Sequence, residues 1–257
     1  MLYGLQILYP SPWRNIVTQS NPQAPILITG IGKRIGLAIA KHLLAQGQPI
    51  IGTYRTHYES IDELQAQGAE LYCCDLYDQA AVLNLVNTLD EQHPTLRGII
   101  HNASDWIPES SNLPPEVVFQ KMMQVHAGAP YEINRLLSDK LLAYSGEHAD
   151  IIHMTDYVAS KGSKKHIAYA ASKAALDNMT LSFSAQLAPR VKVNAIAPAM
   201  IMFNDDDDDA YRAKTLKKSL MEIAPGTDEI LEAVDYLLKS RYVTGRTLHV
   251  DGGRHLK

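Results

Sequence analysis

The stretch PILITGIGKRIG, residues 25–36, joins a short apolar run to a glycine-rich turn, and a segment of helical period follows it. Glycine lets the backbone turn tightly and approach a pyrophosphate, whose charge is stabilised by the free N–H groups of a helix N-terminus. The spacing of Gly30, Gly32 and Gly36 is not the common G-x-G-x-x-G, and such a turn can also be purely structural. Its place between a strand and a helix is nevertheless the context that a dinucleotide site requires.

Six more short apolar runs follow, separated by segments such as 35–46 and 80–91 whose apolar residues recur at helical spacing. The seven runs are residues 25–29, 50–54, 71–74, 98–101, 151–154, 191–196 and 247–250. Strands that alternate with helices indicate a parallel sheet covered on both faces. We therefore predict one α/β domain over residues 25–257, Rossmann-like and doubly wound, with a seven-stranded parallel sheet. Residues 1–24 show no period and are predicted to be a flexible N-terminal extension, with a partner-binding arm as the alternative.

The composition is that of an ordinary globular protein, since 46% of the 257 residues are hydrophobic and 20% are charged. A net charge of -4 leaves no cationic excess for a phosphate backbone, so no nucleic-acid partner is expected. No run approaches the ~18 apolar residues of a membrane span, and the first residues do not read as a signal peptide. Cys73 and Cys74 are adjacent, where a disulfide would be strained, which favours a reducing compartment and a cytoplasmic protein.

Five consecutive carboxylates run from Asp205 to Asp209. Like charges at this spacing repel one another and stay solvated, so the run is predicted to be an exposed, mobile loop. Cation binding is the alternative, and no metal is assigned.

The residues around the second apolar run indicate which dinucleotide binds. In NAD-binding proteins a carboxylate at the end of that strand takes the ribose hydroxyls, whereas a basic residue accommodates a 2′-phosphate. Here the run ends in Arg55, and no acid precedes Glu59. Lys33 and Arg34 lie in the glycine turn, so the three basic residues together favour NADP, although each alone could be an ordinary surface charge.

A tyrosine and a lysine four residues apart, Tyr169 and Lys173, would lie on one face of a helix. The ammonium of Lys173 is expected to lower the pKa of the Tyr169 phenol and to hold a ribose hydroxyl. Tyr169 is then the expected proton donor. Because the pattern YxxxK is common by chance, the pair is weak support by itself.

The motifs taken in order resemble the short-chain dehydrogenase/reductase family from residue 25 to the end. They are the glycine turn, Asp75-Leu76, Asn102-Ala103-Ser104, the Tyr169/Lys173 pair and Asp251-Gly252-Gly253. The resemblance implies a sheet of order 3-2-1-4-5-6-7, hydride transfer from a nicotinamide, and a homodimer or homotetramer. It also implies that Asp75 and Leu76 border the adenine and that Asn102 lines the ribose and supports the nicotinamide side. The expected cofactor residues are Gly30, Gly32, Lys33, Arg34, Ile35, Arg55, Asp75, Leu76, Asn102 and Lys173.

Asp156 departs from the family pattern, because a serine ordinarily stands thirteen positions before the tyrosine. A hydroxyl can donate to a ketone oxygen, whereas a carboxylate only accepts. Asp156 therefore suits a substrate rich in N–H donors, such as the amino-pyrimidinone edge of a pterin, and would repel a developing alkoxide. Thr155 could replace the serine hydroxyl instead.

His126 is a second departure, since the family usually has an asparagine there that helps to hold a catalytic water. A neutral imidazole both donates and accepts, so a proton relay could survive. A histidine that only packs in the core, with its polar atoms satisfied, is the alternative.

Asp156, the Lys33-Arg34 pair and the run Asn102-Ala103-Ser104-Asp105-Trp106 resemble the pteridine reductase branch of the family. In that branch an aromatic residue at the position of Trp106 stacks the pterin on the nicotinamide; core packing is the alternative. The resemblance implies NADPH-dependent reduction of the N5=C6 bond of a 7,8-dihydropterin, with dihydromonapterin as first candidate and dihydrofolate as a further substrate. The rivals are a carbonyl reductase, for example of a 3-oxoacyl thioester, and a non-catalytic NADPH-sensing regulator. The expected catalytic residues are Tyr169, Lys173 and Asp156, and the expected substrate contacts are Arg34, Ser104, Trp106, Asp156 and Tyr169.

Overall fold

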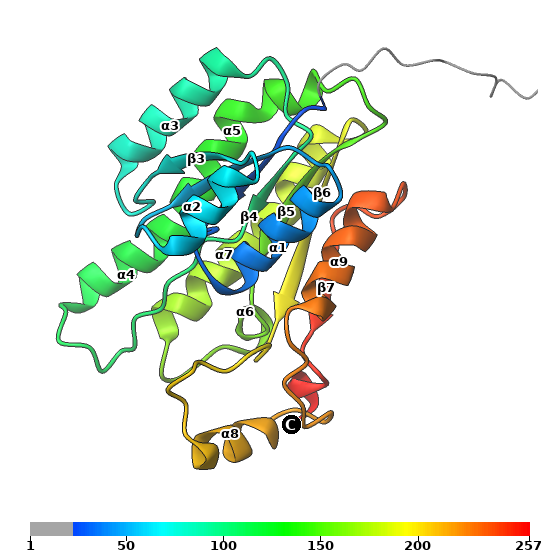
Figure 1. The fold of residues 1–257 in the computed structure, drawn as a ribbon. Coiled ribbons are helices and arrows are strands. Elements are labelled where there is room, and N and C mark those ends of the chain that lie inside the picture. Colours follow the sequence, from blue (N-terminus) through cyan, green and yellow to red (C-terminus); the bar gives the residue numbers. More distant parts are fainter. Residues whose placement is uncertain (1–22) are drawn as a thin grey trace, which may run out of the picture.

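The computed structural model describes residues 23–257, so most of the expected N-terminal extension lies outside the described residues. Its sheet has seven parallel strands in the order β3-β2-β1-β4-β5-β6-β7, which confirms the predicted fold class and order (Figure 1). The strands are β1 Ile26–Thr29, β2 Ile50–Tyr54, β3 Glu70–Cys73, β4 Gly98–His101, β5 Ala149–Met154, β6 Val191–Pro198 and β7 Thr247–Val250. Each strand overlaps one of the seven apolar runs of the sequence.

Helices cover both faces of the sheet, as a parallel sheet requires. They are α1 Arg34–Ala45, α2 Glu59–Ala66, α3 Gln79–Gln92, α4 Pro115–Met123, η1 Gln124–Gly128, α5 Ala129–Leu142, α6 Val158–Lys161, α7 Ile167–Leu187, α8 Asp209–Leu216, α9 Asp228–Lys239 and η2 Arg254–Leu256. Buried side chains of α3, α4, α5 and α7 form one core with the sheet, and those of α1, α2 and α9 form the other. The helix α8 lies apart from both layers, beside the C-terminus (Figure 1).

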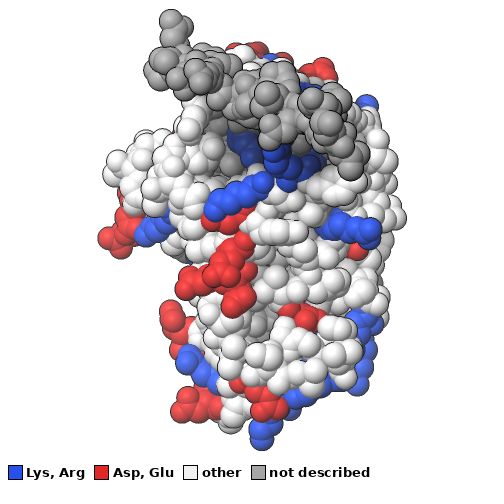
Figure 2. All heavy atoms as spheres, turned by 90° about the vertical axis from the view of Figure 1, so that its right-hand side faces the viewer, with Lys and Arg blue, Asp and Glu red and all other residues white. Residues whose placement is uncertain are grey.

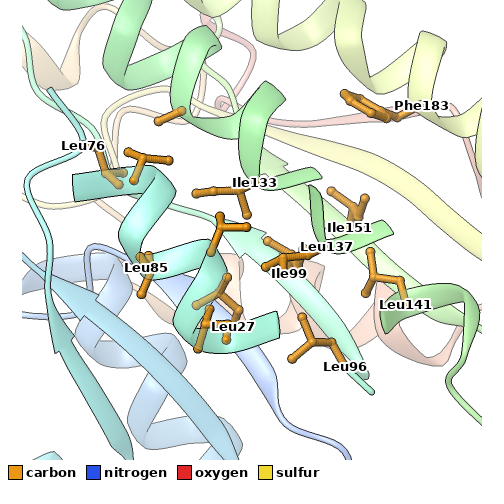
Figure 3. Close-up of a cluster of buried hydrophobic side chains, with 14 of the residues drawn as sticks. Leu27, Leu76, Leu85, Leu96, Ile99, Ile133, Leu137, Leu141, Ile151 and Phe183 are labelled. Atoms are coloured by element: carbon orange, nitrogen blue, oxygen red, sulfur yellow. The ribbon is translucent and has the colours of Figure 1, made fainter. Parts of the chain in front are cut away.

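The strand β1 shows why the central strands are apolar throughout. Leu27 packs in the core under α3 and α5, while Ile26 and Ile28 pack in the core under α1 and α9. Figure 3 shows the first of these cores, with Leu27 of β1 among side chains of α3 and α5. Because both faces are buried, successive side chains of the strand need no polar alternation, and each contributes roughly 1.5–3 kcal/mol by leaving water.

The carboxyl ends of the strands meet at one edge of the sheet, and the strand order reverses between β1 and β4. A crevice forms at such a switch point. Two glycines let the backbone of the turn after β1 pack closely against neighbouring residues in this crevice. Gly30 has a φ of +73°, and a Cβ on it would lie 2.7 Å from Ala103 Cα. A Cβ on Gly36 would collide with the Gly30 carbonyl at 2.1 Å, so neither position accepts a side chain.

The acidic run is only in part the predicted loop. Asp208 is the N-cap of α8 and accepts a hydrogen bond from the Tyr211 N–H at 2.6 Å, and Asp209 is the first residue of the helix. Asp207 accepts from the Asn204 N–H at 2.8 Å. The prediction of a loop through Asp209 is wrong because a helix N-terminus stabilises carboxylates through its free N–H groups.

The surface that carries α9 and β7 bears charges of both signs, with a larger uncharged area between them (Figure 2). Neither the positive nor the negative side chains form a continuous patch on that face. Over residues 23–257 we find no helix with the length and apolar character needed to span a membrane.

Candidate active site

A cavity of about 290 Å³ opens at the switch point of the sheet, between the glycine turn and the ends of β2, β3 and β4. Nine of the ten residues expected to hold a cofactor line it, and only Lys173 does not. These nine are Gly30, Gly32, Lys33, Arg34, Ile35, Arg55, Asp75, Leu76 and Asn102. We call this cavity the cofactor cleft. The chain brings these residues together because each follows a parallel strand at the same edge of the sheet.

Arg55 lies at the wall of the cofactor cleft with half of its side chain exposed. Its two terminal nitrogens both donate to one oxygen of Asp105 at 3.1 Å, and its guanidinium carbon lies 5.5 Å from the centre of the Tyr77 ring. Sequence reasoning missed Asp105 as a partner of Arg55, because the two residues are fifty positions apart and follow different strands. Lys33 lies over the Tyr58 ring, 5.6 Å from its centre.

Arg34 has a left-handed backbone, with a φ of +54°. That conformation costs a residue with a side chain about 1–2 kcal/mol and is ordinarily left to glycine. The guanidinium donates to Asn204 Oδ1 at 2.6 Å and to the Met202 carbonyl at 3.1 Å. Arg34 therefore ties the glycine turn to the segment between β6 and α8.

Asn102 uses its side chain to hold the glycine turn. Its amide donates to the carbonyls of Thr29 at 3.1 Å and Gly30 at 2.9 Å. Asn102 thus lines the cofactor cleft, as expected, while its two N–H groups fix β4 to the turn after β1.

Tyr169, in the first turn of α7, donates its phenol hydrogen to Asp156 Oδ2 at 2.9 Å. The other carboxylate oxygen accepts from the Val158 N–H at 2.9 Å, so the Asp156 carboxylate is held in one orientation. Thr155 instead donates to the Ile196 carbonyl and is buried. The hydroxyl of Thr155 therefore points away from Tyr169, and the carboxylate of Asp156 occupies the position beside the phenol.

The pKa values of this pair are both raised. Burial is the main cause for Asp156, although the Val158 N–H, Tyr169 and Lys173 oppose it. Burial, and then the neighbouring Asp156 carboxylate, raise the pKa of Tyr169 well above its ordinary value. The expectation that Lys173 lowers the pKa of the phenol is therefore wrong, because these two effects favour the neutral phenol. Tyr169 is a hydrogen-bond donor at neutral pH.

Lys173 lies beneath Tyr169 with only 2% of its surface exposed. Its ammonium donates to the Met154 carbonyl at 2.8 Å and lies 5.7 Å from the centre of the Tyr169 ring. Burial lowers the pKa of Lys173 to about 8, although Asp156 opposes this shift. The side chain is not part of the wall of the cofactor cleft, so its expected contact with a ribose stays a prediction.

His126 is 1% exposed and lies in the π-helical turn η1. Its Nε2 is 2.9 Å from the Ser104 hydroxyl at the cofactor cleft, and its Nδ1 is 2.8 Å from the Ser172 hydroxyl. Burial, and then the charge of Lys173, lower the pKa of His126 well below its ordinary value, so the ring is neutral. Sequence reasoning missed Ser172, which stands next to Lys173 on α7 and is visible as a partner only once α7 is packed against η1.

Trp106 follows β4 and is 63% exposed, so core packing is not its role. Its ring meets His166 edge to face, with the centres 5.0 Å apart. A large aromatic side chain held at the surface in this way offers its free face to a flat ligand.

A family model described as enoyl-(acyl carrier protein) reductase matches residues 30–255, which includes every candidate site residue. The chain belongs to the short-chain dehydrogenase/reductase family. Its strand order and the positions of its Tyr169/Lys173 pair and glycine turn agree with that membership.

Several members of the short-chain dehydrogenase/reductase family match nearly the whole chain. A dihydromonapterin reductase of Klebsiella pneumoniae is 55% identical over 233 residues, which are 91% of this chain and 97% of that protein. A dihydromonapterin reductase of Citrobacter koseri is 54% identical over 92% of this chain and 99% of its own. The solved structure of FolM alternative dihydrofolate reductase 1 from Brucella suis in complex with NADP superposes with a TM-score of 0.79 at 26% identity, covering 91% of this chain and 96% of that one.

Proposed function

We propose that this protein is an NADPH-dependent reductase of 7,8-dihydropterins, with 7,8-dihydromonapterin as the first candidate substrate and dihydrofolate as a further one. The reaction reduces the N5=C6 bond, with a hydride added at C6 and a proton at N5. The observation that carries the proposal is the Asp156–Tyr169 pair, in which a fixed carboxylate stands beside a neutral phenol. The relatives that match nearly the whole chain are dihydromonapterin reductases, which supports the same substrate.

The residues of the cofactor cleft fit NADPH. The glycine turn leaves no room for a Cβ at Gly30 or Gly36, so its backbone can approach a pyrophosphate at the N-terminus of α1. Arg55 and Lys33 supply cations for a 2′-phosphate, and Leu76 supplies an apolar wall for the adenine. The bound nicotinamide supplies the hydride. The related Brucella suis structure was solved in complex with NADP.

The substrate is oriented by groups that match the polarity of a pterin. The Asp156 carboxylate accepts from N–H groups of the amino-pyrimidinone edge, and Trp106 covers one face of the ring. Arg34 and Ser104 complete the proposed contacts. Arg34 lies in the glycine turn and is bound to the segment between β6 and α8. Tyr169, or a water that it holds, delivers the proton to N5. Lys173 positions Tyr169 and the cofactor ribose from below.

The carboxylate disfavours the first rival, a reductase of 3-oxoacyl thioesters, because it would repel a developing alkoxide. The complete Tyr169/Lys173 pair disfavours the second rival, an NADPH-sensing regulator without activity. The test follows NADPH loss at 340 nm with 7,8-dihydromonapterin, 7,8-dihydrobiopterin, dihydrofolate and an acetoacetyl thioester. We expect turnover of dihydropterins and none of the thioester. Turnover of the thioester alone would establish a carbonyl reductase, and NADPH binding without turnover of any compound would establish a sensor.

The protein is further proposed to be a cytoplasmic homodimer or homotetramer. Free Cys73 and Cys74 are in keeping with a reducing compartment. Exposed apolar side chains on α5 and α7, among them Tyr131, Leu136 and Leu181, offer a surface that a second copy could bury. Light scattering of the purified protein measures its molar mass in solution. A monomer at all concentrations would refute the proposed homodimer or homotetramer.

A further inference from the structure

A continuous chain of hydrogen bonds runs from the cofactor cleft into α7. It begins at the Ser104 hydroxyl, passes through both nitrogens of His126 and reaches Ser172. Ser172 in turn donates to the Tyr169 carbonyl at 2.8 Å. Ser104 is the one exposed member of this chain, while His126 and Ser172 are buried. The chain therefore presents a single group, the hydroxyl of Ser104, to a ligand.

The geometry fixes where each proton of this chain lies. A hydroxyl has one hydrogen, and Ser172 uses it on the Tyr169 carbonyl, which can only accept. Ser172 must then accept from His126, so Nδ1 carries the imidazole hydrogen. Because the ring is neutral, Nε2 is bare.

A bare Nε2 can only accept, so the hydrogen of the Ser104 hydroxyl is directed inward to it. The lone pairs of Ser104 then face the cofactor cleft, which Ser104 lines, and the neighbouring Tyr169 phenol. We propose that His126 is a positioning residue that holds Ser104 as a hydrogen-bond acceptor for an N–H group of the substrate. The inference rests on the proposed function, and it gives the site a second acceptor besides Asp156.

Two hydrogen-bond acceptors at one site, Asp156 and Ser104, strongly favour a substrate that offers hydrogen-bond donors. A dihydropterin offers several N–H donors, whereas a ketone or the alkoxide formed from it needs donors. A serine that is free to turn would serve either substrate, because a hydroxyl both donates and accepts. His126 removes that freedom, so the specificity of Ser104 depends on a residue that does not itself touch substrate.

The first test does not depend on any substrate. The ¹⁵N chemical shifts of the His126 ring in the folded protein report which nitrogen is protonated. We expect the Nδ1–H tautomer at neutral pH, with Nε2 unprotonated. An Nε2–H tautomer, or a charged ring, would overturn the inference, whatever the enzyme reduces.

The second test uses two substitutions of His126 that separate its two contacts. In His126→Gln the side-chain amide reaches the place of Nε2 and can accept from Ser104, whereas in His126→Asn it reaches only the place of Nδ1 and keeps Ser172. We expect His126→Asn to lose roughly 5- to 100-fold in kcat/KM for 7,8-dihydromonapterin, chiefly through KM, with the KM for NADPH unchanged. His126→Gln should retain most of the parent activity.

A double-mutant cycle with Ser104→Ala decides whether His126 acts through Ser104. If it does, adding His126→Asn to Ser104→Ala costs little more than Ser104→Ala alone. Additive losses, or equal losses in the Asn and Gln variants, would show that His126 only supports packing. Parent turnover of dihydropterin is measured first, so a failure of the proposed function appears in the parent, and a failure of this inference appears only in the variants or in the ¹⁵N spectrum.

Discussion

Two buried histidine chains differ in where they end. In the core, the Asn134 side-chain oxygen accepts from His101 Nε2 at 2.8 Å, and its amide nitrogen donates to His153 Nε2 at 3.1 Å. His153 Nδ1 then lies 2.8 Å from the Thr180 hydroxyl. Thr180 donates to the Leu176 carbonyl, so this chain closes inside the protein. The chain through His126 has the same kinds of bonds but opens at Ser104 on the cofactor cleft.

The comparison shows that burial and neutral histidines do not by themselves mark a functional residue. Burial lowers the pKa of His101 to about 4 and that of His153 well below its ordinary value, just as it does for His126. All three rings are neutral at physiological pH. The core chain can contribute to stability and the uniqueness of packing, whereas the open chain can also orient a group toward a ligand.

The largest expected effect is at the Tyr169 phenol, which lies beside the open chain. Tyr169→Phe removes the phenol donor but keeps the aromatic ring against His126. In the parent the two ring centres are 5.2 Å apart. We expect kcat for 7,8-dihydromonapterin to fall by roughly 10²- to 10⁴-fold. Thermal unfolding and the Kd of NADPH serve as controls and should stay close to the parent. A variant that retains most of its activity would mean that water alone supplies the proton.

The closed chain should respond in the opposite way. Asn134→Leu leaves buried nitrogens of His101 and His153 without a partner, at a cost of about 1–3 kcal/mol of stability for each. Urea unfolding should therefore show a clear loss, while kcat/KM of the protein that remains folded stays near the parent value. If activity fell without a loss of stability, the core chain would be coupled to the site and the comparison would fail.

Arg55→Ala tests the cofactor end of the site. Charge-assisted hydrogen bonds to a 2′-phosphate contribute on the order of 1.5–3 kcal/mol, so the Kd of NADPH should rise roughly 10- to 100-fold while that of NADH changes little. Asp105→Asn is the matched control, because it weakens the ion pair that holds Arg55 and leaves the arginine in place. Equal losses for both cofactors would show that Arg55 does not read the phosphate.

Trp106→Ala should have the smallest effect, on substrate alone. Because the side chain is 63% exposed, its loss should leave the unfolding temperature nearly unchanged. The KM for dihydropterin should rise by about 3- to 10-fold as one stacking face is lost, and Trp106→Phe should recover most of it. Loss of NADPH affinity in the alanine variant would place Trp106 at the cofactor instead.

The sequence predicts the parts of this protein that depend on local pattern. The apolar runs locate all seven strands, because a strand buried on both faces must be apolar throughout. The glycine turn locates the cofactor cleft, because Gly30 and Gly36 are required by close backbone approach. The sequence also places Asp156 thirteen residues before Tyr169, just after β5 and in the first turn of α7 respectively, but the hydrogen bond between the two side chains is seen only in the structure.

What the sequence does not predict depends on contacts between distant elements. The ion pair of Arg55 with Asp105 and the bond of Arg34 to Asn204 join residues that follow different strands. The raised pKa of Tyr169 depends on burial, which a four-residue spacing does not reveal. The partner of His126 on α7 depends on how the π-helical turn η1 packs, and that turn has no signature in the sequence.

The most direct test of the account measures kcat/KM for 7,8-dihydromonapterin against pH in the parent and in Asp156→Ser. Because the pKa of Asp156 is raised, its carboxylate becomes protonated at a higher pH than that of an ordinary aspartate. As the pH falls, the kcat/KM of the parent should therefore decline in that higher pH range. As the pH rises through about 8, Lys173 loses its charge, and the alkaline side should follow. Asp156→Ser should lose roughly tenfold to a few hundredfold at neutral pH and should lack the acid side, because no carboxylate remains to titrate. A serine variant with the activity and the pH profile of the parent would show that Asp156 is not a substrate ligand and would contradict the account.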